Sequence, residues 1–266
     1  GNAGQVLGSV GTRVPTGAGA IGTTALPVTL VDGGGYSWDI QGDGRIGGYV
    51  PGDPVNSGFY LSGLPYVSTA VTHQSGREVV HGPNSSSVGG LDTTRSVFVP
   101  DDRSFARFLD VFTNSTNHTI DTTVYYYSNV DSLVTMDTSS GDTVLTNDDY
   151  WLVTDDSGGT DHAFAHVVGG PGGLRTSGFA IGGDNISWSY YLSVAPGETV
   201  ALLSFGIQDA FLDPAIIANS AAALASLSGD VLDGLTGAEL DAIINFQTQS
   251  SDSYFFDVTA ATTLTL

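Results

Sequence analysis

The chain has 266 residues, of which 41% are hydrophobic, and this apolar content excludes a disordered chain and allows a sizeable core. Seven basic residues, all Arg, stand against 28 acidic ones, and the net charge of −21 disfavours nucleic acid and anionic lipid surfaces as partners. The absence of Cys excludes disulfides, zinc sites built on Cys and a Cys nucleophile. No apolar segment approaches the length of a membrane span, so membrane insertion is not predicted.

The first part of the chain, residues 1–24, is rich in Gly, Thr and Ala and is predicted to be a linker or an irregular leading strand. Residues 1–11 lack the basic start and apolar run of a signal peptide. We therefore expect that a leader was removed or that the sequence is a piece of a longer protein. The remainder, residues 25–266, is predicted to be a single large domain.

Most of that domain consists of short segments with strand-like patterns, separated by turn residues about every ten positions. The predicted strands are 26–31, 36–40, 58–61, 66–72, 77–80, 94–99, 105–113, 120–129, 132–138, 150–154, 163–168 and 187–194. Segment 105–113 has apolar residues at both parities and is expected to be buried on both faces, whereas 120–129 separates into a more apolar and a more polar face. The pattern predicts a mainly β fold, a large antiparallel β-sandwich of stacked sheets.

Residues 213–247 carry helical signals instead. Asp213-Pro214 supplies a cap and a first-turn proline before an Ala-rich run, and Gly229 ends it. Thr236 and Glu239 have the spacing of a capping box, which opens a second helix to about residue 246. We predict a small helical hairpin packed on the sheets, followed by a return to β structure in the tail.

The acidic residues are mostly Asp, since Glu occurs three times, and they lie among Gly, Ser, Thr and Asn in predicted loops. Short carboxylates in tight turns suit calcium. One loop has the opening of an EF-hand, with ligands at positions one, three and five: Asp39, Gln41 and Asp43. Val50 occupies position twelve, so a complete EF-hand is excluded, but Asp53 could add a ligand. The alternative is an ordinary hairpin turn rich in Asp and Gly.

A second candidate calcium loop holds three carboxylates within seven residues: Asp155, Asp156 and Asp161. A further acidic cluster at 147–149 lies at the opposite end of the predicted strand 150–154, so the two clusters form separate sites. A solvated hairpin loop is the alternative here. Taken over all loops, calcium is the predicted cofactor, and adaptation to high salt is the competing explanation of the acidity.

Aromatic residues in the predicted strands are candidates for ligand binding. Trp188 and Tyr190 share parity and would lie on one face of a strand. Together with Tyr150 and Trp151 they are the predicted ligand-binding residues, and the Tyr125–Tyr127 segment offers further rings. Such rings could stack on sugars, and the alternative is core packing between strands.

Three longer segments stand out: Gly-Tyr-Ser-Trp-Asp-Ile-Gln-Gly-Asp-Gly at 35–44, Phe-Ala-Arg-Phe-Leu-Asp-Val-Phe-Thr-Asn at 105–114 and Ile-Ile-Asn-Phe at 243–246. They resemble a β-sandwich module that recurs in large exported bacterial surface proteins. Such modules often sit beside calcium-loaded repeats, including those of RTX-type adhesins. The resemblance implies an extracellular module, secreted or at the cell surface. We expect it to serve calcium-associated adhesion, and its partners would be a glycan or peptide on a cell surface or neighbouring copies of the same protein.

Two other functions remain open. The chain could be a structural spacer or fibre subunit that joins its neighbours by strand addition. It could also be a carbohydrate-active enzyme on a sandwich fold, which would need two convergent carboxylates in a cleft. No catalytic residues are predicted, since the sequence contains no G-x-S-x-G elbow, phosphate loop or dinucleotide fingerprint.

Overall fold

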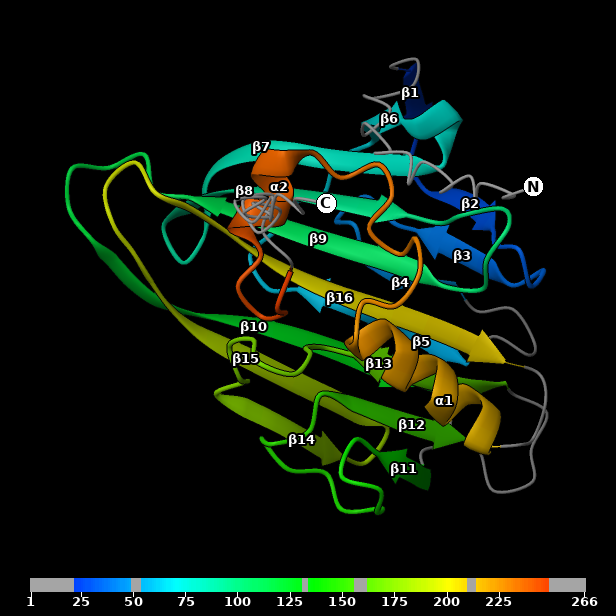
Figure 1. Cartoon of the computed structure of the whole chain (residues 1–266). Helices are drawn as coiled ribbons and strands as arrows, with labels where there is room; N and C mark the ends of the chain where they lie inside the picture. Colours follow the sequence, from blue (N-terminus) through cyan, green and yellow to red (C-terminus); the bar gives the residue numbers. More distant parts are fainter. Residues whose placement is uncertain (1–21, 49–53, 131–133, 156–161, 210–213, 249–266) are drawn as a thin grey trace, which may run out of the picture.

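A computed structural model describes residues 22–48, 54–130, 134–155, 162–209 and 214–248 of the chain. These residues form two large antiparallel sheets that pack face to face, with two short α-helices on one side (Figure 1). The prediction of a mainly β, antiparallel sandwich is confirmed.

The larger sheet has nine strands in the described part of the chain. Their spatial order is β1 (Gly22–Ala25), β6 (Thr69–His73), β7 (Glu78–Val88), β8 (Leu91–Phe98), β9 (Ala106–Thr113), β16 (Thr199–Asp209), β13 (Ala163–Val167), β12 (Trp151–Asp155) and β11 (Val134–Thr138). A single 3₁₀ turn, Gln74–Gly76, connects β6 to β7. Because β9 and β16 lie at the centre of this sheet, both of their faces are covered by other parts of the protein.

The smaller sheet has seven strands among the described residues. Their order is β14 (Gly178–Gly182), β15 (Asn185–Val194), β10 (Ile120–Val130), β5 (Val55–Leu61), β4 (Ile46–Gly47), β3 (Ser37–Ile40) and β2 (Val28–Val31). The turn between β2 and β3 is held by Asp32, whose carboxylate accepts hydrogen bonds from the Gly34 and Tyr36 amides and from Trp38 Nε1 at 2.8–3.0 Å. Burial raises the pKa of Asp32, and these three donors act against the rise.

The space between the sheets holds the main hydrophobic core. On β10 the residues that point inward, among them Val124 and Tyr126, are buried, while Tyr125 and Tyr127 point outward and are exposed. The predicted separation of this strand into two faces is therefore confirmed. On β9 both parities are buried along most of the strand, as expected for a strand covered on both faces.

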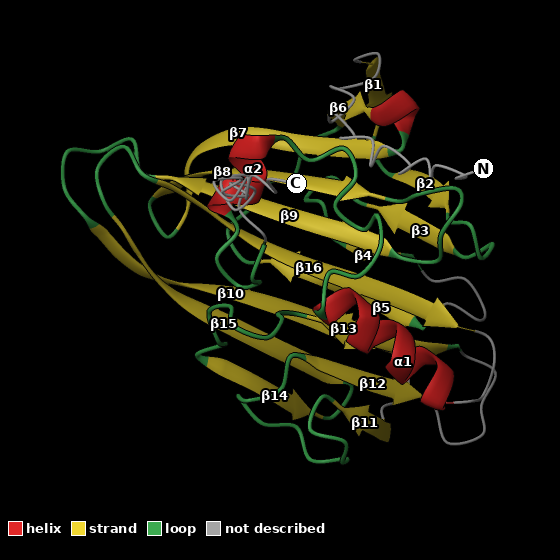
Figure 2. Ribbon diagram, viewed as in Figure 1, coloured by secondary structure: helices red, strands yellow, loops and turns green. Residues whose placement is uncertain are grey.

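A second core lies on the outer face of the nine-stranded sheet, under α1 (Pro214–Ala225) and α2 (Gly237–Ala242) (Figure 2). Ile217, Ala221 and Leu224 of α1 are buried there against side chains of β12, β13 and β16. The molecule thus has three layers: the helices lie over part of the larger sheet, and within the described ranges no helix packs on the outer face of the smaller sheet (Figure 1).

The helical region differs from its prediction in one respect. The capping box is confirmed, since Thr236 Oγ1 accepts from the Glu239 amide and the Glu239 carboxylate accepts from the Thr236 amide. However, α2 ends at Ala242, and α1 and α2 each pack on the sheet and not on one another as a hairpin (Figure 1). α1 packs on β11, β12, β13 and β16, whereas α2 contacts β16, so the two helices lie over different parts of the sheet. No helix in the described ranges is long and apolar enough to cross a membrane.

Three strands were not predicted: β4, β14 and the central strand β16. Residues 200–208 of β16 are buried without a break, because the second sheet covers one face and the helices cover the other. A strand in that position has no alternation of polar and apolar residues, so the period-two signal is missing.

Candidate functional site

The candidate site is built on the outer face of the seven-stranded sheet. Tyr125 and Tyr127 project from β10 on this face and are 59% and 37% exposed. Large aromatic side chains are usually buried in a sandwich, so two exposed rings in adjacent outward positions of one strand suggest a binding surface.

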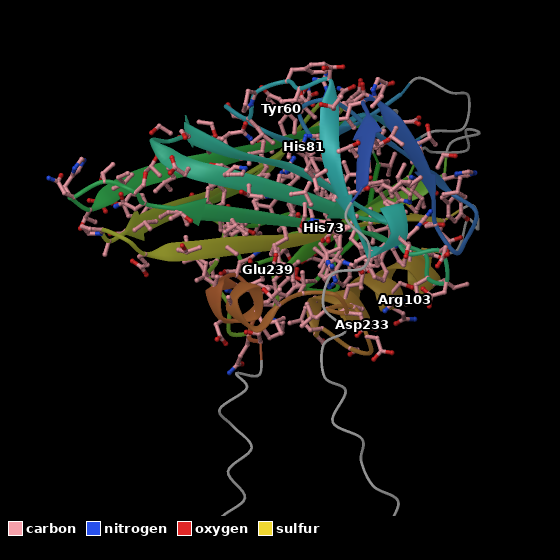
Figure 3. The ribbon with its side chains drawn as sticks, turned by 90° about the horizontal axis from the view of Figure 1, so that it is seen from above. Tyr60, His73, His81, Arg103, Asp233 and Glu239 are labelled. Atoms are coloured by element: carbon pink, nitrogen blue, oxygen red, sulfur yellow. The ribbon has the colours of Figure 1, made fainter. Side chains whose placement is uncertain are left out.

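Strand register adds a third ring to these two. Tyr60 of β5 lies directly opposite Tyr127, and on the other side of β10 Ser187 of β15 occupies the matching position. Residues that are directly paired across strands have their side chains on the same face of the sheet. Figure 3 shows Tyr60 on the side of the molecule away from Asp233 and Glu239, which belong to the helical layer.

Together these residues surround a hollow of about 440 Å³. Its lining consists of Arg45, Ser57, Tyr60, Ser62, Tyr125, Tyr126, Tyr127 and Ser187. The described part of the lining therefore combines aromatic rings with hydroxyl groups, and the single charged side chain among these residues is a cation.

Arg45 is fixed by two contacts. Its guanidinium lies over the Tyr60 ring, 5.8 Å from the ring centroid, and its Nε lies 3.6 Å from Asp43 Oδ1. The Arg45 side chain is 39% exposed, whereas that of Asp43 is 10% exposed. The cationic group of this pair is therefore the one that faces solvent.

An amide network holds Tyr127, one of the residues that line the hollow. Asn185 Oδ1 accepts hydrogen bonds from the Tyr127 hydroxyl and, at 2.7 Å, from Asn129 Nδ2. Asn129 Oδ1 in turn accepts from Asn56 Nδ2 at 3.3 Å. These contacts link β5, β10 and β15 and restrict the orientation of the Tyr127 ring.

The aromatic residues predicted to bind ligand lie elsewhere. Trp188 and Tyr190 do share a face, but that face points into the core between the sheets, where they are 2% and 1% exposed. The Tyr126 ring stacks on Trp188 with centroids 5.2 Å apart and an interplanar angle of 2°. The prediction that they form a stacking platform is wrong for these two, because their ring faces are already covered.

Tyr150 and Trp151 are also unavailable as an open platform. Trp151 is buried in the core beneath the helices. Tyr150 is half-buried, and the guanidinium of Arg175 lies over its ring, 4.5 Å from the centroid. Of the rings discussed from the sequence, Tyr125 and Tyr127 are therefore the ones that lie exposed in the hollow.

The first predicted calcium loop is held by contacts within the protein. Asp39 accepts a hydrogen bond from the Thr29 hydroxyl, and Gln41 Nε2 donates to the carbonyl oxygens of Asp39 and Gly47 at 3.4 Å. Asp43 faces Arg45 as described. Asp53 lies outside the described residues, so this ligand set is only partly placed.

In the second predicted loop, Asp155 is buried at the end of β12, while Asp156 and Asp161 lie outside the described residues.

In the acidic cluster at 147–149, the Asp149 carboxylate is bound by other groups of the protein. Asp149 accepts hydrogen bonds from Ser139 Oγ, the Ser140 amide, and the Thr146 amide and hydroxyl at 2.8–3.0 Å, and these donors hold its pKa below the ordinary value against the effect of burial. Within the described ranges no three His, Asp or Glu side chains are grouped to hold a metal.

A charged cluster is also buried between the sheets. Arg95 pairs with Asp110, whose carboxylate also accepts from the Tyr126 hydroxyl at 2.9 Å. Burial and the Asp110 carboxylate both raise the pKa of Tyr126 well above its ordinary value, so the hydroxyl stays protonated. His81 lies in the same region, and burial together with the charge of Arg95 lowers its pKa to about 4. These groups are almost fully buried, and their role is to hold the sheets together.

Sequence reasoning identified Tyr125 and Tyr127 as candidate rings but missed Tyr60 and Arg45. The alternation in 120–129 was the signal for the first two. Tyr60 and Arg45 reach the hollow only because β5 pairs with β10 and β4 pairs with β5. The local sequence does not determine the register of these pairings.

Comparisons with known proteins give distant structural similarity only. No protein-family model and no curated protein matches the chain. Among solved structures, a polysaccharide lyase is similar over 75% of this chain and 34% of its own, with 12% identity and a TM-score of 0.38. A TPR-domain protein from Parabacteroides distasonis is similar over 66% of this chain and 45% of its own, with 12% identity and a TM-score of 0.41.

A protein described as an aldose 1-epimerase from Escherichia coli K12 is similar over 72% of this chain and 84% of its own, with 10% identity and a TM-score of 0.36. The chain spans less than half of the lyase and TPR-domain chains. At these TM-scores the similarities indicate nothing about function.

Proposed function

We propose that this protein binds a saccharide chain in the hollow on the outer face of the seven-stranded sheet. The observation that carries the proposal is the group of three tyrosines, Tyr60, Tyr125 and Tyr127, which line one solvent-facing hollow from two adjacent strands.

The chemistry of the lining suits a sugar. A pyranose ring has an apolar face of C–H groups and an edge of hydroxyls, so it pairs with an aromatic face on one side and with hydrogen-bonding groups on the other. The tyrosine rings supply the first kind of contact. Hydroxyls at Ser57, Ser62 and Ser187 lie in the same lining and supply the second.

The hollow is also well supported. Its rings project from β5 and β10, which are paired in the interior of the seven-stranded sheet, and Asn185, which accepts from Asn129 and Tyr127, holds the Tyr127 ring. A site on regular strands loses little conformational entropy when a ligand binds, because its side chains are already ordered.

Binding is favoured over hydrolysis at this position. Glycosidases use two carboxyl groups on either side of the bond that they cleave. Among the described residues that line the hollow none is a carboxylate, and the lining offers hydroxyls, rings and one guanidinium. Secretion, a cell-surface setting and a role in adhesion, all expected from the sequence, stay predictions that are compatible with saccharide binding.

The proposal is tested by screening the purified chain against immobilised and soluble oligosaccharides, followed by calorimetry on each ligand found. Tyr125→Ser and Tyr127→Ser should weaken binding about tenfold or more, equivalent to roughly 1.4 kcal/mol each. Tyr66→Ser is the matched control, because Tyr66 is 60% exposed and does not line the hollow.

Failure of every saccharide to bind, or equal binding by all three variants, would contradict the proposal. Thermal unfolding of each variant checks that the fold is intact. Release of new sugar ends during incubation with a bound polysaccharide would replace a binding function by an enzymatic one.

A further inference from the structure

The charge of the hollow differs from that of the rest of the chain. Acidic residues outnumber basic ones by 28 to 7, yet the hollow is lined by one Arg and, in the described residues, by no Asp or Glu. We propose, building on the saccharide-binding function, that the hollow selects acidic saccharides, and that Arg45 is the specificity-determining residue that binds their carboxylate or sulfate group.

The geometry of Arg45 fits this role. Its contact with Asp43 is made through Nε, so the edge formed by the two terminal nitrogens is not used by that contact. This edge is the one that grips a carboxylate or sulfate end-on with two parallel hydrogen bonds. Asp43 is the less exposed partner of this ion pair, so the group of the pair that faces solvent is the cation.

Arg45 lies over the Tyr60 ring and lines the same hollow as Tyr125 and Tyr127, so its charge lies near the exposed rings that would receive a sugar. A sugar packed on this tyrosine surface would bring a substituent on its edge within reach of the guanidinium. One side of the lining would therefore hold the ring of an acidic sugar unit, and the other would hold its charge.

The net charge of −21 does not prevent such binding. At an ionic strength of about 0.15 M the Debye length is about 8 Å, so exposed carboxylates far from the hollow are largely screened. The contact with Arg45 is direct and is screened much less. The overall field is expected to slow the approach of an acidic glycan more than it weakens the final contact.

The test uses the whole chain at 0.15 M salt and three soluble ligands of equal length: an oligogalacturonate, its fully methyl-esterified form and a sulfated neutral oligosaccharide. Wild type should bind at least one of the two acidic ligands about tenfold more tightly than the esterified form. Arg45→Gln should lower the affinity for that acidic ligand about tenfold and so remove the preference. The acidic ligand that depends on Arg45 identifies carboxylate or sulfate as the recognised group.

Arg175→Gln is the control, because Arg175 is an exposed Arg that lies over Tyr150 and not in the hollow. Equal binding of acidic and esterified ligands by wild type would overturn the inference and leave the saccharide-binding function standing. An equal loss of both ligands in Arg45→Gln would also overturn it, since Arg45 would then support only the shape of the hollow. If no saccharide binds to wild type, the proposed function itself fails, and the inference falls with it.

Discussion

Arg95 and Asp110 form a bidentate ion pair in the core that lies between the two sheets, with Nε to Oδ1 at 2.7 Å and Nη2 to Oδ2 at 2.8 Å. Both side chains come from the nine-stranded sheet and are almost completely buried. Arg95 Nη1 also donates to the carbonyl oxygen of Phe59, and the Tyr126 hydroxyl donates to Asp110, so the pair ties this sheet to β5 and β10 of the other. This cluster lies directly inside the strands that carry the hollow.

Arg95→Met is expected to lower the free energy of unfolding by about 3–5 kcal/mol, because it leaves the Asp110 carboxylate buried and uncompensated. Urea denaturation followed by circular dichroism measures the change. The double variant Arg95→Met with Asp110→Leu should be more stable than Arg95→Met alone. Asp148→Asn is the control, since Asp148 faces Arg175 in an exposed pair and should change stability by less than about 1 kcal/mol. A loss below 1 kcal/mol for Arg95→Met would contradict this account of the core.

Trp188 and Tyr125 lie on strands of the same sheet, but Trp188 is a core ring and Tyr125 faces the hollow. Replacing each of them should therefore change stability by different amounts. Trp188→Ala should lower the free energy of unfolding by about 3–5 kcal/mol, because it leaves a cavity between the sheets. Tyr125→Ala removes a ring that is 59% exposed and should cost less than about 1 kcal/mol. Denaturant titrations of the two variants measure the difference. Similar losses for both would show that the hollow is part of the folded core.

His166 is expected to make the protein sensitive to acid. The ring is fully buried on the inner face of β13, stacks on Phe59 at 5.1 Å, and has no hydrogen-bond partner among the described residues for either nitrogen. Burial lowers the pKa of His166 to about 3 from its ordinary value of 6.5. In the pH range between these two values the unfolded chain binds a proton that the folded protein does not, so the free energy of unfolding falls as pH falls below about 6.5.

His166→Leu should therefore gain stability relative to wild type as pH is lowered from 7 to 4.5, and the two pH profiles should run parallel above pH 7. Urea midpoints at four pH values in this range measure the effect. His118→Gln is the control, because His118 is an exposed loop residue. Parallel profiles for wild type and His166→Leu across the whole range would contradict the prediction. His81, whose pKa is also lowered by burial, contributes in the same direction and remains in both proteins.

Calcium stays a prediction from the sequence, and it is tested by thermal unfolding with excess calcium and then with EDTA. An ion that binds only the folded protein must raise the melting temperature, so chelation should lower it by several degrees if Asp53, Asp156 and Asp161 complete the predicted sites. Magnesium at the same concentration is the control for ionic strength. An unchanged melting temperature would leave the acidic loops as turns of the kind that Asp149 forms with Ser139 and Thr146.

The local sequence was sufficient for features that depend on neighbours along the chain. The alternation in 120–129 identified which residues of β10 share a face, and Thr236 with Glu239 identified the start of α2, because both patterns follow from the geometry of a single element. The density of strand and turn signals was enough to predict the sandwich.

Packing between distant segments decided the rest. Parity placed Trp188 and Tyr190 on one face of a strand, but only the position of the second sheet shows that this face is the inner one. The central strand β16 carried no alternation because both of its faces are covered. The hollow depends on the register that sets Tyr60 opposite Tyr127, although 67 positions of sequence separate the two residues. It also depends on the path of the chain into β4, which brings Arg45 over Tyr60. A strand's own residues fix which side chains share a face, whereas which face meets solvent, and which rings meet across strands, is fixed by the strands and layers that pack around it.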